Sequence, residues 1–332
     1  MRKVSELLLV FLVLALSCGF AFANGTNEGS GNSKNSATAT VKWPSSVEII
    51  VPAGAGGDTD FNARLLAQIL SSKLNTNFVV SNVNGNGGAT GTRQVKDAKP
   101  DGSTVLFYHS AVVVNKLTGA ADYGFDAFDF ACIAAKSRGN CITINSKLGV
   151  KTLPELIDYS KRHPGTLKIA VQIGATSHAS ALLLKSVGLD ATVVDAGSAA
   201  QRLTALLGGH VDIILAAYGT IKDYIDSGEL VAVAIDSQAD LDEVGVKSVE
   251  SYGYKIGFPF FYSFSFPKGT NPELVQQLSN AVKDIVENDK SYQDKIYKAY
   301  YQLPTYYNSV DGLAQYQNVY ELLKGVDFSI KK

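Results

Sequence analysis

The sequence predicts an α/β fold of two lobes, each a mostly parallel sheet flanked by helices. Apolar, β-branched runs such as Val47–Val51 alternate with segments of helical periodicity such as Phe61–Lys73. This alternation stops near Phe130–Asn145, where two strand-like runs follow each other, and then resumes. About 290 residues from Trp43 onward are more than one hydrophobic core comfortably holds. A chain that crosses between two such lobes implies a hinge and a cleft.

Residues 43–138 are expected to form the first part of the first lobe. Its expected strands are Val47–Val51, Phe78–Val80 and Thr104–Tyr108. Helices are expected after Asp60 and near Thr92–Ala98. The resulting βαβαβ order is typical of a parallel sheet with helices on both faces.

The second lobe is expected in residues 139–257, and residues 258–332 are expected to return to the first lobe. Strands of the second lobe are predicted at Lys168–Val171, Ala191–Val194, Val211–Leu215 and Leu230–Ile235. Turns at Gly174–His178 and Asp195–Ser198 open helices between them. The returning segment begins with an aromatic strand at Phe258–Phe266, followed by a helix at Pro272–Val286 and a tyrosine-rich tail.

The first 42 residues are expected to lie outside the folded part. A signal peptide for export to the periplasm is predicted over residues 1–23. The evidence is a basic start, the apolar run Leu7–Leu16 and the segment Ala21–Ala23. Cys18 leaves lipid anchoring open as the alternative. Residues 24–42 are polar and aperiodic, which predicts a disordered tether.

Two glycine-rich turns, Pro52–Asp60 and Asn84–Gly91, each follow a strand and open a helix. Backbone N–H groups at a helix N-terminus, unshielded by side chains, form a site for an anion. Neither turn is a phosphate-binding loop, because Asp58 follows Gly57 and an alanine follows Gly88 where lysine would be required. Two turns in consecutive units suggest a small acid held by backbone amides; the alternative is that the glycines only permit tight turns.

Composition argues against several other classes of function. The formal net charge is −1 and the basic residues are scattered, which gives no case for nucleic-acid binding. The histidines are dispersed, no metal-ligand spacing or cofactor motif occurs, and no nucleophile elbow surrounds a serine. The chain is therefore expected to be neither an enzyme nor a metal- or cofactor-binding protein. Cys132 and Cys141 are expected as two buried thiols, with a disulfide as the alternative.

Several motifs occur in a characteristic order. Pro52–Asp60 is followed by Ala63-Arg64, Asn82–Gly91 carries Asn-x-x-Gly-x-Gly-Gly-x-x-Gly, and Pro100–Thr104 and Leu206–Asp212 follow in register. In this order, over about residues 45–320, the chain resembles the tripartite tricarboxylate transporter receptors, the Bug-type extracytoplasmic solute-binding proteins.

The resemblance implies a type II, Venus-flytrap periplasmic binding protein. Such a monomer captures a small organic carboxylate (a di- or tricarboxylate, an amino acid or a hydroxy acid) and delivers it to membrane transporter subunits. A subunit that senses the ligand for a membrane kinase is the alternative, with an α/β enzyme acting on a small acid as a more distant one. By resemblance, the ligand is held by Ala55, Gly56, Gly57, Asp58, Thr59, Asn86, Gly87, Gly88, Ser110, Thr176, Ser177, Gly197 and Ser198.

The chain departs from the family pattern at the far end of the expected ligand. Asp195 and Ala196 stand where the family usually has a tyrosine and a basic residue, and Tyr218 and His109 also differ from the usual residues. We include Asp195, Tyr218 and His109 among the candidate ligand contacts. A carboxylate at Asp195 would disfavour a second ligand carboxylate and favour an ammonium or hydroxyl group. The alternative is that Asp195 caps a helix or pairs with Arg202.

Overall fold

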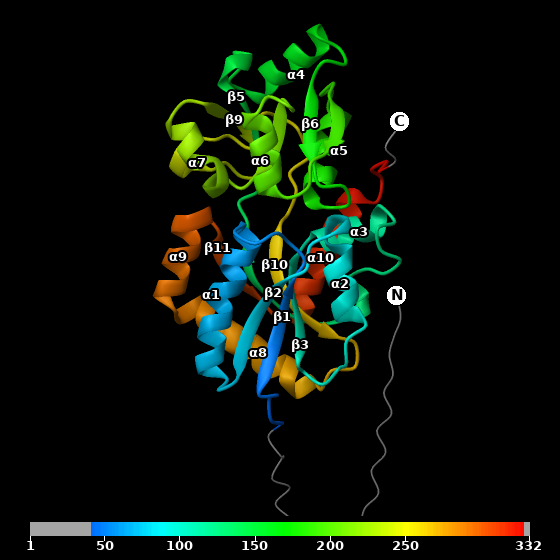
Figure 1. Cartoon of the computed structure of the whole chain (residues 1–332), viewed down its shortest axis with the longest axis vertical. Helices are drawn as coiled ribbons and strands as arrows, with labels where there is room; N and C mark the ends of the chain where they lie inside the picture. The colour runs from blue at the N-terminus through cyan, green and yellow to red at the C-terminus, as the bar shows by residue number, and fades with distance from the viewer. Residues whose placement is uncertain (1–40, 329–332) are drawn as a thin grey trace, which may run out of the picture. The chain divides into compact units, whose positions relative to one another are not determined.

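The structure is a computed structural model that describes residues 41–328. The predicted signal peptide, and all but the last two residues of the predicted tether, lie outside the described residues. The two-lobed α/β fold predicted from the sequence is confirmed, with one sheet in each lobe (Figure 1).

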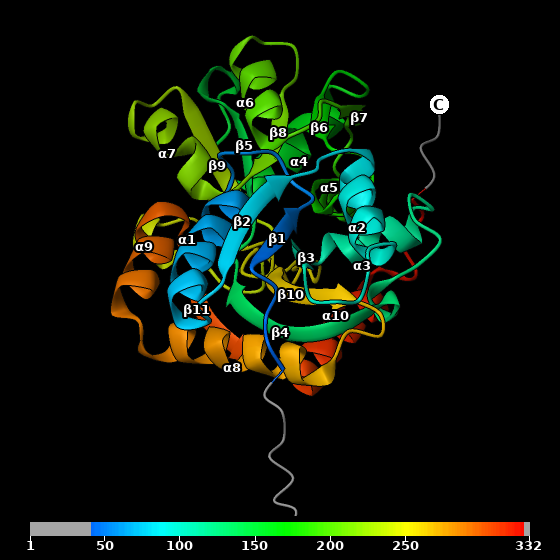
Figure 2. The same ribbon diagram turned by 60° about the horizontal axis from the view of Figure 1, so that its bottom comes forward.

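The first lobe is built on a six-stranded sheet. Its strands, in order across the sheet, are β11 (Leu303–Tyr307), β4 (Phe128–Lys136), β10 (Phe261–Pro267), β3 (Thr104–His109), β1 (Ser46–Val51) and β2 (Asn77–Asn82). On one face pack α1 (Asp58–Lys73), α8 (Pro272–Asn288) and α9 (Lys290–Tyr300). The helices α2 (Ala89–Lys96), α3 (Ala111–Leu117) and α10 (Ser309–Leu323) lie on the other face (Figure 2).

The second lobe is built on a five-stranded sheet. Its strands, in order, are β7 (Thr192–Asp195), β6 (Lys168–Val171), β8 (Ile213–Ala216), β5 (Cys141–Asn145) and β9 (Leu230–Ile235). Its helices are α4 (Leu153–Arg162), α5 (Thr176–Ser186), α6 (Ala199–Leu207) and α7 (Tyr218–Asp226). Capping boxes fix the starts of two of them, Thr152 with Glu155 at α4 and Ser198 with Gln201 at α6.

Both sheets are mixed rather than mostly parallel. β1 pairs parallel with β2 and β3, and β6 pairs parallel with β7 and β8, as βα units require. β10 runs antiparallel to both β3 and β4, β11 runs antiparallel to β4, and β5 runs antiparallel to both β8 and β9. Two of these strands, β5 and β10, directly follow a crossing between lobes, so the chain reaches them from the other sheet instead of from a helix of their own unit.

The segment between β4 and β5 is one of these crossings. β4 belongs to the first sheet and β5 to the second, so Cys132 and Cys141 lie in different sheets. Both are buried free thiols, and burial raises the pKa of Cys132 to about 12. The expectation of two buried thiols is therefore confirmed.

Short 3-10 turns complete the connections: η1 (Asn86–Gly88), η2 (Phe125–Ala127), η3 (Ser146–Leu148) and η4 (Asp242–Val244). The central strands β1, β3, β4 and β10 are almost entirely buried between the helical layers. No helix within residues 41–328 is both long enough and apolar enough to cross a membrane.

Candidate ligand-binding site

A cavity of about 120 Å³ lies between the two lobes. It opens at the carboxyl ends of β1 and β3 in the first lobe and of β6 and β8 in the second, where α/β sheets place their ligands. The first lobe contributes the turn Pro52–Thr59 together with Tyr108, His109 and Phe260. The rest of the lining is Asn140, Gln172, Ala175, Thr176, Ser177, Ser198, Ala199, Ala200, Arg202, Ala217 and Thr220.

The first glycine-rich turn presents backbone amides to this cavity. Its shape is fixed by Asp60, which accepts a hydrogen bond from the Gly56 amide (2.9 Å) and pairs with Arg64 (3.0 Å). Gly56 takes a φ of +77°, a conformation that favours glycine. Gly57 caps α1 without a side chain, and no acceptor in the described part of the chain takes the Gly57 amide. The N-terminus of α1 is thus open to an anion.

Asp58 is the acidic side chain of the cavity lining. Its carboxylate accepts hydrogen bonds from the Thr59 amide (2.8 Å) and from the hydroxyl of Tyr262, a buried residue of β10. Burial raises the pKa of Asp58 above its ordinary value, and these hydrogen bonds lower it by less. The carboxylate is therefore held in position, but its hydrogen bonds offset only part of the cost of burying its negative charge.

Arg202, on α6 of the other lobe, is the basic side chain of the lining. It is 6% exposed, and its two terminal nitrogens donate to the carbonyls of Gly197 (2.6 Å) and Leu215 (2.8 Å). Its Nε has no hydrogen-bond partner among the residues that the structure describes. Burial lowers the pKa of Arg202 to about 10, so the guanidinium stays charged at neutral pH. We did not select this residue from the sequence as a ligand contact, because no local signal marks it as one.

His109 ends β3 at the cavity. Burial lowers its pKa to about 3, so the ring is neutral. Its Nδ1 accepts a hydrogen bond from the Ala111 amide (3.2 Å), and the ring packs against Tyr108 and Phe260. His109 therefore contributes a neutral, sterically fixed wall.

The second glycine-rich turn does not line the cavity. The carbonyl of Gly87 accepts hydrogen bonds from the Tyr108 hydroxyl (2.8 Å) and from Asn115 (2.9 Å), and Asn115 also donates to the carbonyl of Gly174 in the other lobe (2.8 Å). A Cβ at Gly87 would lie 2.5 Å from the backbone of Gly174, and one at Gly88 would lie 1.9 Å from the Tyr108 hydroxyl. This turn is a tightly packed contact between the lobes.

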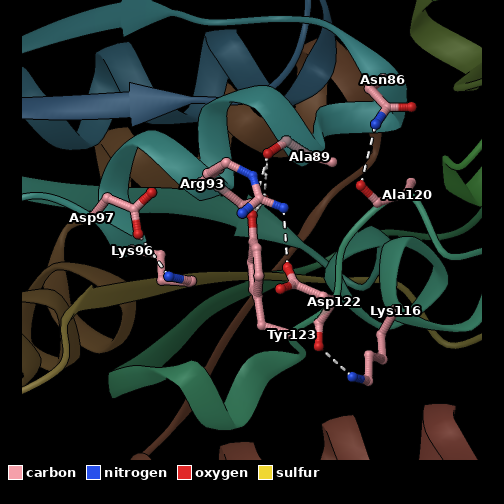
Figure 3. Close-up of polar contacts among 10 residues, drawn as sticks. Asn86, Ala89, Arg93, Lys96, Asp97, Lys116, Ala120, Asp122 and Tyr123 are labelled. Atoms are coloured by element: carbon pink, nitrogen blue, oxygen red, sulfur yellow. Dashed lines mark hydrogen bonds and ion pairs between the residues drawn. The ribbon is translucent and has the colours of Figure 1, made fainter.

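Figure 3 shows how the neighbouring loop supports this turn. Asn86 donates to the carbonyl of Ala120 (3.2 Å), and Tyr123 donates to the carbonyl of Ala89 (3.2 Å). Arg93 and Asp122 form an exposed ion pair (3.0 Å) beside them. All of these contacts hold the start of α2 against the loop that follows α3.

Three further predicted residues, Ser110, Asp195 and Tyr218, lie outside the cavity lining. Ser110 is fully buried, and its hydroxyl donates to the Pro259 carbonyl (3.0 Å). Asp195 is exposed and accepts from the Gly197 amide (3.2 Å). Tyr218 is buried against Tyr301, with 5.4 Å between the ring centroids.

The cavity thus brings some predicted residues together and leaves others outside. In its lining are Ala55, Gly56, Gly57, Asp58, Thr59, His109, Thr176, Ser177 and Ser198. Outside it are Asn86, Gly87, Gly88, Ser110, Asp195, Gly197 and Tyr218. Within residues 41–328, no group of three or more His, Cys, Asp or Glu side chains is arranged to hold a metal ion.

Comparison with known proteins identifies the family of this chain. Residues 62–316 match the model of the tripartite tricarboxylate transporter family receptors. The chain belongs to this family. The "UPF0065 protein in the TAR-I ttuE-ttuC' intergenic region" of Agrobacterium vitis is 30% identical over 262 residues, 76% of this chain and 75% of that protein.

Two solved structures share the fold. The periplasmic binding protein BugD superposes with a TM-score of 0.76 at 24% identity, over 85% of this chain and 96% of that one. MatC from Rhodopseudomonas palustris, with bound malate, gives a TM-score of 0.76 at 23% identity, over 84% of this chain and 97% of that one. BugD is described as a periplasmic binding protein and MatC contains bound malate.

Proposed function

We propose that this receptor captures a small organic carboxylate in the cavity between its lobes and delivers it to a tripartite tricarboxylate-type membrane transporter. The observation that carries the proposal is the pairing, in one cavity, of the open Gly57 amide at the N-terminus of α1 with a buried guanidinium at Arg202. Both features stabilise an anion. The malate bound to the related MatC supports the same ligand class.

In this proposal the ligand joins the two lobes. The first lobe supplies amides of the turn after β1, and the second supplies Arg202 together with the start of α5 at Thr176-Ser177. Contacts outside the cavity, such as Asn115 with the Gly174 carbonyl, would form in the same closure. Closure of two domains around a ligand is a common switching motion, and the closed form would be the one that the transporter recognises.

The proposed function also requires export of the protein and movement of one lobe against the other. We infer a signal peptide over residues 1–23 that exports a monomer to the periplasm, with lipid anchoring at Cys18 as the alternative. We also infer that residues 43–138 and 258–332 move together as one lobe against residues 139–257. No catalytic step is part of this function.

The test is mass spectrometry of ligand retained through purification, followed by calorimetry and small-angle scattering with the identified acid. We expect a stoichiometric small carboxylate and a smaller radius of gyration at saturation. A protein that binds no carboxylate, or whose scattering curve is unchanged at saturation, would contradict the proposed mechanism.

A further inference from the structure

Arg202 is a buried charge that forms no ion pair with a carboxylate among residues 41–328, although Asp58 and Asp195 act on it at longer range. The acceptors of its hydrogen bonds, at Gly197 and Leu215, are neutral carbonyls. A guanidinium has five N–H donors, so Nε and further hydrogens remain available. Leaving a buried cation without an opposite charge is costly, which indicates that an anion completes the site.

Asp58 presents the opposite charge from the other lobe. Tyr262 and Thr59 hold its carboxylate at the cavity wall. Asp58 and Arg202 do not form an ion pair with each other, yet they are the charged side chains among the described residues of the lining. His109, the remaining titratable imidazole there, is neutral.

We propose that the ligand is a zwitterion, whose carboxylate accepts hydrogen bonds from Arg202 and the Gly57 amide and whose ammonium group donates to Asp58. This inference rests on the proposed function, because it names the class of carboxylate that the same cavity takes. Amino acids are the small molecules that carry both groups.

The charge balance separates a zwitterion from a dicarboxylate. Asp58 and Arg202 together have no net charge, so a neutral zwitterion leaves the closed cavity neutral with each charge opposite its complement. A dicarboxylate would place its second carboxylate against Asp58, and like charges in a desolvated site repel strongly. A hydroxy acid would satisfy Arg202 but would leave Asp58 without a counter-charge.

The experiment is calorimetry on the purified protein with matched ligand pairs. γ-Aminobutyrate and succinate share a four-carbon chain and differ by an aminomethyl group, with its ammonium, in place of a carboxylate. Alanine and lactate differ by an ammonium in place of a hydroxyl. We expect the amino member of at least one pair to bind about tenfold more tightly or better. We expect Asp58→Asn to remove this preference, and Arg202→Gln to weaken binding of both members by about tenfold or more.

The exposed pair Arg93 and Asp122 provides matched controls (Figure 3). Arg93→Gln and Asp122→Asn make the same chemical changes outside the cavity, and we expect them to leave both affinities unchanged. Because Arg202 also holds two backbone carbonyls, circular dichroism checks the fold of its variant. If Arg202→Gln does not fold, the ratio of affinities in Asp58→Asn decides the question.

The outcomes distinguish this inference from the function on which it rests. A wild-type protein that binds succinate or lactate more tightly than its amino partner, in both pairs, would overturn the zwitterion and leave the carboxylate receptor standing. An Asp58→Asn variant with an unchanged ratio would also overturn it. If no carboxylate binds at all, in these pairs or in the retained-ligand search, the proposed function fails as well.

Discussion

The two glycine-rich turns follow the same sequence pattern, a strand, a bare backbone turn and a helix, but the structure uses them differently. The turn after β1 borders the cavity, and a Cβ at Gly56 would meet nothing within 4 Å. The turn after β2 is enclosed, so that Cβ atoms at Gly87 and Gly88 would overlap Gly174 and Tyr108. Glycine in the first turn keeps amides accessible, whereas glycine in the second permits close packing.

The largest effect is expected at the enclosed turn. Gly88 combines a φ of +98° with an approach of 1.9 Å between an added Cβ and the Tyr108 hydroxyl. We expect Gly88→Ala to reduce the free energy of unfolding by about 3 kcal/mol or more, from overpacking and backbone strain together. Urea unfolding measures this change. A loss below about 1 kcal/mol would show that the second turn is as open as the first.

Asn115 tests the same enclosed turn through its hydrogen bonds. Its side chain donates to the carbonyls of Gly87 and Gly174, one in each lobe. We expect Asn115→Ala to cost about 2 kcal/mol in the free energy of unfolding, because buried carbonyls lose their donor. The isosteric Asn115→Asp should cost more, since it turns an oxygen toward both carbonyls. If the two variants are equally stable, these hydrogen bonds do not hold the lobes.

Asp58 tests the open turn through pH. Burial raises its pKa in the folded state above the ordinary value of 3.8, so the folded protein holds the proton more tightly than the unfolded chain does. The stabilisation from this group is therefore complete below about pH 4 and is lost as pH rises through the folded pKa. We expect Asp58→Asn, which cannot ionise, to be more stable than the wild type at pH 7. Unfolding curves measured from pH 4 to 7 should show that the free energies of unfolding of the variant and the wild type differ increasingly as pH rises. A difference that does not change with pH would contradict this account.

The smallest effect is expected at Gly56. An added Cβ there meets no atom within 4 Å, and the cost is that of a positive φ, 77°, in a residue other than glycine. We expect Gly56→Ala to lower the free energy of unfolding by about 1 kcal/mol, measured by urea unfolding beside Gly88→Ala. If the order of the two variants were reversed, the contrast between the turns would be wrong.

Much of the fold could be predicted because it depends on local periodicity. Strands such as β1 and β6, and helices such as α4 with its capping box, follow from patterns within a few residues. The direction of a strand cannot be predicted in this way, because the pattern of apolar residues is the same in both directions. The antiparallel direction of β10 was therefore not predicted. The helix α3 was missed as well, since its valines favour strands unless packing overrides them.

The site was less predictable because its walls come from distant parts of the chain. The first turn was found from its own glycines. The burial of the second turn depends on Gly174 and on Asn115, which are 59 residues apart. Arg202 becomes a cavity residue only when α6 faces the turn after β1. No local signal carries such information.

The central place of β10 has a consequence for how the protein folds. This strand fills the gap between β3 and β4, and Ser263 bonds to Tyr108 across 155 positions of sequence. The second sheet, in contrast, is assembled from the continuous stretch between β5 and β9. Contacts between residues that are distant in sequence form slowly, and strand edges that are not yet paired are prone to aggregate. We therefore expect the lobe that is synthesised first to complete its folding last, with β3 and β4 in need of protection until the final third of the chain has arrived.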